Sequence, residues 1–108
     1  NAGLSPSIRF LSRRARLKIA GIRHDQHGDL GPNGARGSVV NIARTGEKSN
    51  IGHSHSAGIT HGCYQVGTFS LLDMGYNTGP SSWSHSAIIT YANGKRAVLT
   101  LRAGKWRA

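Results

Sequence analysis

The sequence lacks any long hydrophobic run, and this absence limits where the protein can act. No apolar segment approaches the ~20 residues of a membrane-spanning helix, and no signal peptide is visible. We therefore expect a cytoplasmic protein with no membrane span. The chain also lacks an initiator methionine, which we interpret as the mark of a processed product or a fragment.

Cysteine is nearly absent, because Cys63 is the single cysteine among 108 residues. One cysteine excludes an internal disulfide and a cysteine-based zinc knuckle. We expect Cys63 to be a small buried side chain in a reducing compartment rather than a catalytic thiol.

Acidic residues are few: 4 Asp and Glu oppose 14 Lys and Arg, for a net charge of +10. The basic residues gather before Asp25 and again in residues 95–107. This surplus favours a polyanionic partner such as nucleic acid; equally, it fits a basic face that pairs with acidic surface elsewhere in a larger protein. Aromatic residues make up 6% of the chain and are not interleaved with the basic runs, which argues against a platform that stacks single-stranded bases.

Length and composition predict one domain or a domain fragment over residues 1–108, in which residues 1–16 are a basic N-terminal segment. The hydrophobic fraction of 37% and the 15 glycines predict a thin core and many loops. The fold class that we predict is α/β, β-rich toward the C-terminus.

Periodicity and turn residues predict the elements in order. In the first half we expect a helix over residues 5–14 and a strand over 17–22. A turn over 30–34, a helix over 35–45 and a strand over 48–51 follow. In the second half we expect strands over residues 62–68, 87–91 and 97–101, and a final short strand after Ala103-Gly104. One long loop over residues 71–84 separates the first of these strands from the others. Asn93-Gly94 is a strong signal for a two-residue hairpin turn between two of these strands.

Two histidine motifs each follow a predicted strand. Gly52-His53-Ser54-His55 places two imidazoles at i and i+2, on the same side of an extended segment. Upstream, residues 24–29 hold two more histidines and two of the four acidic residues. Ligands collect beyond the strand ends of β-α-β units, and imidazole with carboxylate suits zinc, manganese or iron. The competing interpretation is that these are solvent-facing loop histidines.

Several motifs in this order resemble the calcineurin-like metallophosphoesterases. They are His27-Gly28-Asp29, the glycine-rich run over residues 31–38, and Gly52-His53-Ser54-His55. Further strings over residues 72–77 and 79–85, with the hairpin over residues 91–96, are similar to a phage-encoded branch, the DNA-transfer phosphoesterases of tailed phages. The resemblance covers residues 17–106 and would place the protein in the host cytoplasm.

The resemblance implies the C-terminal portion of a layered α-β-β-α sandwich with a pair of divalent metals, whose identity stays open among manganese, zinc and iron. It implies that His27 and His53 bind one metal, and that His55 reaches the other metal and contacts the substrate side as the catalytic residue. Two metals would clamp a phosphoryl group for in-line attack. The earlier family motifs, which supply the carboxylates, are missing, so we expect this chain alone to be a poor catalyst or an inactive one.

Four other residues are candidates for supporting roles. Asp29 either orients a ligand histidine or caps the turn before Pro32. Asn33 and Arg36 lie in a glycine-rich loop that opens a predicted helix, a setting that suits an anion, although a plain capping loop is the commoner outcome. His85 either approaches the site or is an exposed residue at a strand end. We expect His24 and His61 to be structural or surface residues, and Trp83 and Trp106 to pack.

Two functions of different classes remain. The first is a metal-dependent phosphodiesterase or nuclease that acts on DNA and is present here as its metal-binding C-terminal part. The alternative is a non-catalytic module that binds nucleic acid or serves in virion assembly. In the first case a missing N-terminal half or a second copy of the chain would complete the site, and the sheet surface that this half should cover favours association.

Overall fold

A computed structural model describes residues 7–76 and 79–108. The first half of the chain forms a β-α-β unit. Strand β2 (Ile22–Arg23) leads through a loop with the 3-10 turn η1 (Pro32–Gly34) to helix α1 (Val39–Ala43), and the chain returns as β3 (Ser49–Ile51). Strands β2 and β3 pair in parallel at Arg23 and Ser49. The predicted order of strand, histidine loop, helix, strand and histidine loop is therefore confirmed.

The β-α-β unit belongs to a five-stranded sheet in the order β1-β2-β3-β5-β4. Strand β5 (Cys63–Gln65) lies parallel to β3, whereas β1 (Lys18–Ile19) and β4 (Gly58–Thr60) form antiparallel edges. A separate antiparallel sheet has the order β6-β7-β8. Its strands are Ser86–Thr90, Arg96–Arg102 and Lys105–Arg107.

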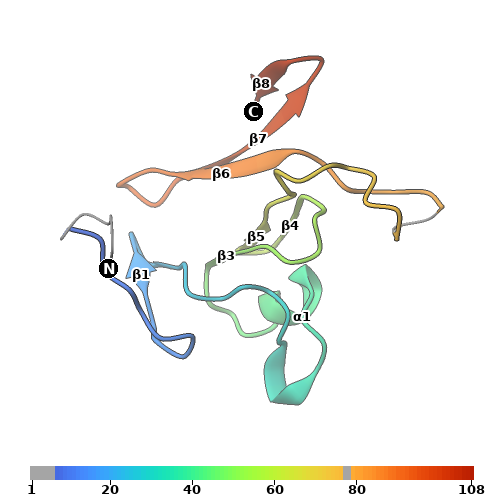
Figure 1. The fold of residues 1–108 in the computed structure, drawn as a ribbon. Helices are drawn as coiled ribbons and strands as arrows, with labels where there is room; N and C mark the ends of the chain where they lie inside the picture. The colour runs from blue at the N-terminus through green and yellow to red at the C-terminus, as the bar shows by residue number, and fades with distance from the viewer. Residues whose placement is uncertain (1–6, 77–78) are drawn as a thin grey trace.

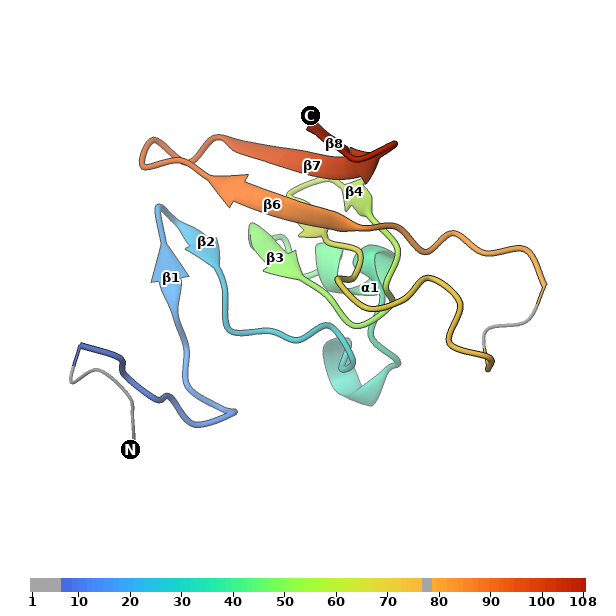
Figure 2. The same cartoon turned by 45° about the horizontal axis from the view of Figure 1, so that its top comes forward.

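Figure 1 shows the layers: α1 lies beneath the five-stranded sheet, and the β6-β7-β8 sheet lies above it. In the turned view of Figure 2, β6 and β7 again lie across β3 and β4, and α1 lies on the far side of these strands. Polar contacts join the two sheets, among them a hydrogen bond of 3.0 Å from the Asn50 amide to the Thr90 hydroxyl. The protein is thus a mixed α/β fold, rich in strands and poor in helix.

The core is as thin as the composition predicts. Its buried apolar residues are Ile22, Ile42, Ile51 and Cys63. Ile42, Ile51 and Cys63 form one cluster between α1 and the five-stranded sheet, so the small side chain of Cys63 has a packing role, as expected. Burial raises the pKa of its thiol, which keeps the group protonated and unreactive.

Four predicted elements differ from the observed ones. The strand over 62–68 is shorter, since β5 spans Cys63–Gln65. The helix over 5–14 is wrong for the described residues 7–14, which form turns and irregular chain; Ser5 and Pro6 lie outside the described residues. Ile8 and Leu11 are each about half exposed, so no apolar face is buried to stabilise a helix there. The strand over 17–22 is instead a hairpin of β1 and β2, because Ala20 and Gly21 adopt φ of 53° and 77° and form its two-residue turn.

The helix predicted over 35–45 is shorter, since α1 spans Val39–Ala43. The Ser38 hydroxyl accepts a hydrogen bond from the Asn41 backbone N–H and caps the helix there. Before this cap, Arg36 forms a bridge with Leu30 instead of a helical turn. Strand β4 was missed by the sequence patterns; its hairpin turn with β5 uses His61 at φ 51°.

A second helical layer, which the resemblance implies, is not formed by residues 7–76 and 79–108: α1 and η1 are the helical elements there. The same part of the chain contains no helix with the length and apolar character that crossing a bilayer requires.

Candidate functional site

The structure brings His27 and His53 together at the ends of two parallel strands. His27 follows β2 and His53 follows β3, and the two strands are neighbours in the sheet. The His27 Nε2 and His53 Nδ1 atoms lie 3.0 Å apart, with the rings edge to face at a centroid distance of 4.9 Å. Both side chains are exposed. The result is a pair of solvent-facing imidazoles at the edge where parallel strands end.

A close backbone contact holds the two histidine loops in this register. The Gly52 N–H donates to the His27 carbonyl oxygen at 2.7 Å. Gly28 has φ of 115°, and a Cβ atom there would come within 2.6 Å of the Gly52 carbonyl oxygen. Glycine at position 28 therefore lets the loops touch.

His55 points elsewhere. Its ring meets the Trp83 ring edge to face at 4.3 Å between centroids. Its Nδ1 atom is buried and has no hydrogen-bond partner within the described part of the chain. The structure thus places His55 against Trp83, whereas His27 and His53 contact each other.

The His27–His53 pair has the donor chemistry and the spacing that one metal ion needs. Two imidazole nitrogens bound to one ion at about 2.1 Å each would be roughly 3.0–3.4 Å apart for bond angles between 90° and 109°. The observed separation of 3.0 Å falls in this range. No group of three or more His, Cys, Asp or Glu side chains in metal-binding range occurs in residues 7–76 and 79–108. The described residues therefore bring two imidazole donors together, and a metal site here would need further donors from outside them.

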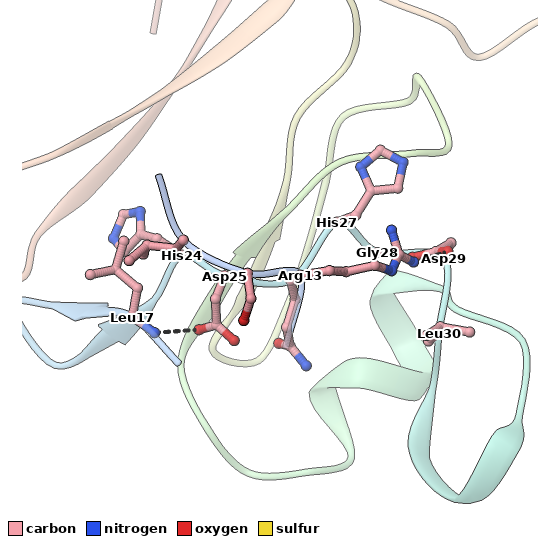
Figure 3. Close-up of a pocket in the computed structure, with 11 residues that line it drawn as sticks. Arg13, Leu17, His24, Asp25, His27, Gly28, Asp29 and Leu30 are labelled. Atoms are coloured by element: carbon pink, nitrogen blue, oxygen red, sulfur yellow. Dashed lines mark hydrogen bonds and ion pairs between the residues drawn. The ribbon is translucent and has the colours of Figure 1, made fainter. Parts of the chain in front are cut away.

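A cavity of about 400 Å³ lies beside this pair, lined by residues 11–13, 17 and 24–30. Figure 3 shows Arg13 extending past Gly28 toward Asp29, with His27 above. The Asp29 carboxylate accepts a hydrogen bond from Arg13 at 2.7 Å. Burial has the largest single effect and would raise the pKa of Asp29, but the hydrogen bond and the charge of Arg13, together with smaller local contributions, lower the net pKa. Asp29 is thus engaged by Arg13, which neither alternative from the sequence anticipated.

Asp25 has a structural role at the floor of the cavity. Its carboxylate accepts hydrogen bonds from the Arg23 guanidinium and from the Leu17 backbone N–H, and Figure 3 draws the bond to Leu17. Arg23 also pairs with Glu47 at 3.2 Å. The Arg23 hydrogen bond, opposed in part by burial, holds the pKa of Asp25 at about 2. Asp25 therefore ties the β1-β2 hairpin to the loop that carries His27.

Acid is expected to weaken the fold through Asp25. Because its folded pKa is about 2 and the ordinary value is 3.8, the stabilisation is complete above roughly pH 5 and is lost as pH falls through 2. It amounts to about 2 kcal/mol of unfolding free energy. Urea unfolding at pH 6 should therefore show wild type more stable than Asp25→Asn by this amount, and the difference should shrink at pH 3 and below. A difference independent of pH would contradict the assignment.

The remaining candidates lie apart from the histidine pair. Asn33 is exposed at the 3-10 turn η1 with φ of 57°. Arg36 lines a cavity of about 380 Å³ together with Ser54, the residue between His53 and His55, so positive charge does lie next to this loop. His85 is half-buried and bonds through Nε2 to the Ser70 carbonyl oxygen at 2.8 Å.

The sequence patterns missed Arg13, Tyr76 and Trp83 as residues near the candidate site, and they assigned His24 of the upstream motif a structural or surface role. His24 lines the Asp25 cavity and a second cavity of about 280 Å³ shared with His27. Trp83 does pack, as predicted, but against His55 and Tyr76. The run of basic residues over 9–16, which includes Arg13, was the one feature of the sequence that could have indicated a role for Arg13. No local pattern indicated the contact between His55 and Trp83, since the two residues are distant along the chain.

Comparison with known proteins gives one informative relative. The chain is 45% identical over 107 residues to Protein A1 of Escherichia phage T5. The match covers 99% of this chain and 19% of that protein, so the chain spans about a fifth of the relative's length. No protein-family model matches the chain, and no solved structure does. The chain is therefore similar to one segment of a much longer phage protein, whose name states no activity.

Proposed function

We propose that this chain is the metal-binding C-terminal part of a calcineurin-like metallophosphoesterase that hydrolyses phosphodiesters, with DNA as the substrate. The observation that carries the proposal is the pair of exposed imidazole nitrogens of His27 and His53, 3.0 Å apart at the ends of parallel strands. The similarity to a phage protein supports a phage-encoded enzyme that acts in the host cytoplasm.

In this proposal His27 and His53 bind one divalent cation, and His55 binds a second cation. When bound, such an ion supplies electrostatic stabilisation of a phosphoryl oxygen. The Nδ1 atom of His55 is buried and has no hydrogen-bond partner among residues 7–76 and 79–108. This supports a role for the side chain beyond packing, because a buried polar atom without a partner is costly. Arg36, beside Ser54, is placed to attract the phosphate, and the net charge of +10 favours a polyanionic substrate.

The two histidines leave the site incomplete, so the carboxylate ligands must come from another segment or from a second copy of the chain. We expect the chain alone to bind metal and to hydrolyse bis-p-nitrophenyl phosphate slowly or not at all.

Replacing His53 with alanine is expected to weaken manganese or zinc binding at least about tenfold, because one of two imidazole donors is lost. Isothermal titration calorimetry measures the affinity, and far-ultraviolet circular dichroism checks that the variant is folded. His61→Ala is the matched control, since His61 is an exposed histidine in the β4-β5 turn. Equal metal affinity in wild type, His53→Ala and His61→Ala would contradict the proposal.

A non-catalytic module that binds nucleic acid is the second candidate, favoured by the small number of ligands in the described residues and by the net charge. It predicts DNA affinity that falls steeply with salt and does not change when the metal is chelated. DNA affinity that requires the metal would exclude this candidate.

A further inference from the structure

Three aromatic rings form a row beside the histidine loop, one from that loop and two from the segment before β6. His55 meets Trp83 at 4.3 Å between centroids, and Trp83 meets Tyr76 at 5.6 Å. Tyr76 is 68% exposed, so the row leads from the His53–His55 loop toward solvent. We define these three residues as the aromatic row.

The central ring of the row is anchored on both sides. The Ser84 N–H donates to the His55 carbonyl oxygen at 3.1 Å, and the Ser56 and Ser82 hydroxyls are 2.6 Å apart. Trp83 lies between these two contacts, so its backbone is held against the histidine loop. A ring that is fixed before binding loses little conformational entropy when a ligand stacks on it.

We propose that Tyr76 and Trp83 stack on unpaired bases of a single-stranded nucleic acid whose phosphates approach the histidine loop; this rests on the proposed function, because it assigns the substrate class of the same site. Every base has a π face, so exposed aromatic rings bind single strands without sequence preference. Paired bases within a duplex present only their edges, which cannot stack on the row.

Charge complementarity supports a nucleic-acid occupant over an apolar partner. The protein carries a net charge of +10, and Arg36 lines a cavity with Ser54 of the same loop. Three of the four acidic side chains are engaged by Arg or Lys on or near the β1-β2 hairpin, namely Asp25, Asp29 and Glu47. The fourth, Asp73, bonds to the Gly75 backbone N–H of its own turn. The sequence argued against stacking because the aromatic residues are not interleaved with basic runs. The tertiary structure instead brings Tyr76 and Trp83 into contact with each other and with His55.

The test measures binding of a fluorescent oligothymidine to the full chain by anisotropy, with the metal chelated. Tyr76→Ala is expected to weaken this binding roughly 5- to 100-fold, and Tyr76→Phe should keep it, because phenylalanine retains the ring. An abasic strand of equal length carries the same phosphates without bases, so Tyr76→Ala should leave its affinity unchanged. Tyr91→Ala is the matched control, because Tyr91 is also an exposed tyrosine, at 51%, but follows strand β6.

Two results would overturn the proposal: an equal loss of affinity for the oligothymidine and the abasic strand in Tyr76→Ala, or equal affinity of the wild type for a duplex and a single strand of the same length. Both measurements omit the metal. A failure here therefore leaves the His53→Ala metal titration as an independent test of the proposed function, and a failure of that titration leaves the base-stacking result standing.

Discussion

Replacing Gly28 with alanine is expected to lower the free energy of unfolding by roughly 2–5 kcal/mol and to separate the two histidine loops. Two effects add. The residue has φ of 115°, which side chains other than glycine rarely adopt, and the new Cβ would lie 2.6 Å from the Gly52 carbonyl oxygen. Relief of that contact must move the His27 loop away from Gly52, and this movement separates His27 from His53.

Gly34→Ala isolates the steric part of this effect. Gly34 also has a positive φ, of 79°, but a Cβ atom there would meet nothing within 4 Å. We expect a cost of only about 1 kcal/mol for this control. Urea unfolding measures both variants, and a manganese titration compares their metal affinity with the affinity that we propose for the His27–His53 pair. If Gly28→Ala is no less stable than Gly34→Ala, the loops do not depend on this contact.

Replacing Arg96 with alanine is expected to cost about 3 kcal/mol of unfolding free energy, because this side chain joins the two sheets. From β7, its guanidinium donates to the carbonyl oxygens of Ser49 and Gly62 and to the side-chain oxygen of Asn50, at 2.8–2.9 Å. It also lies 3.8 Å above the centre of the Tyr64 ring. Burial of the guanidinium lowers its pKa, so the three hydrogen bonds and the ring must offset lost hydration.

Arg102→Ala is the control for Arg96, because it removes the same side chain from an exposed position at the end of β7. Its expected cost is within about 0.5 kcal/mol. Thermal and urea unfolding compare the two variants. The described partners of Arg96 are neutral oxygens and a ring, so its contribution should persist at high salt, where exposed ion pairs weaken. Equal stability of Arg96→Ala and Arg102→Ala would contradict this role.

The sequence by itself determined the features that depend on neighbours along the chain. Asn93-Gly94 predicted the β6-β7 hairpin, and Gly94 adopts φ of 83° there. The predicted two-residue turn is wrong, because Thr90 pairs with Arg96 and the Tyr91 N–H donates to the Lys95 carbonyl oxygen, which leaves a longer loop. The parallel β-α-β unit followed from a strand, a capped helix and a second strand in order, because such crossovers return in parallel. This order also placed His27 and His53 at one edge of the sheet, since neighbouring parallel strands end at the same side.

Only the tertiary structure decided which of these residues touch. The helix expected over 5–14 did not form over its described residues, because the tertiary fold buries no face for it and Arg13 pairs with Asp29. His55 contacts Trp83, which lies 28 residues later in the chain. The bond network of Arg96 spans 34 to 47 residues. Such contacts carry no local signal, because their energies arise only when distant segments are packed together.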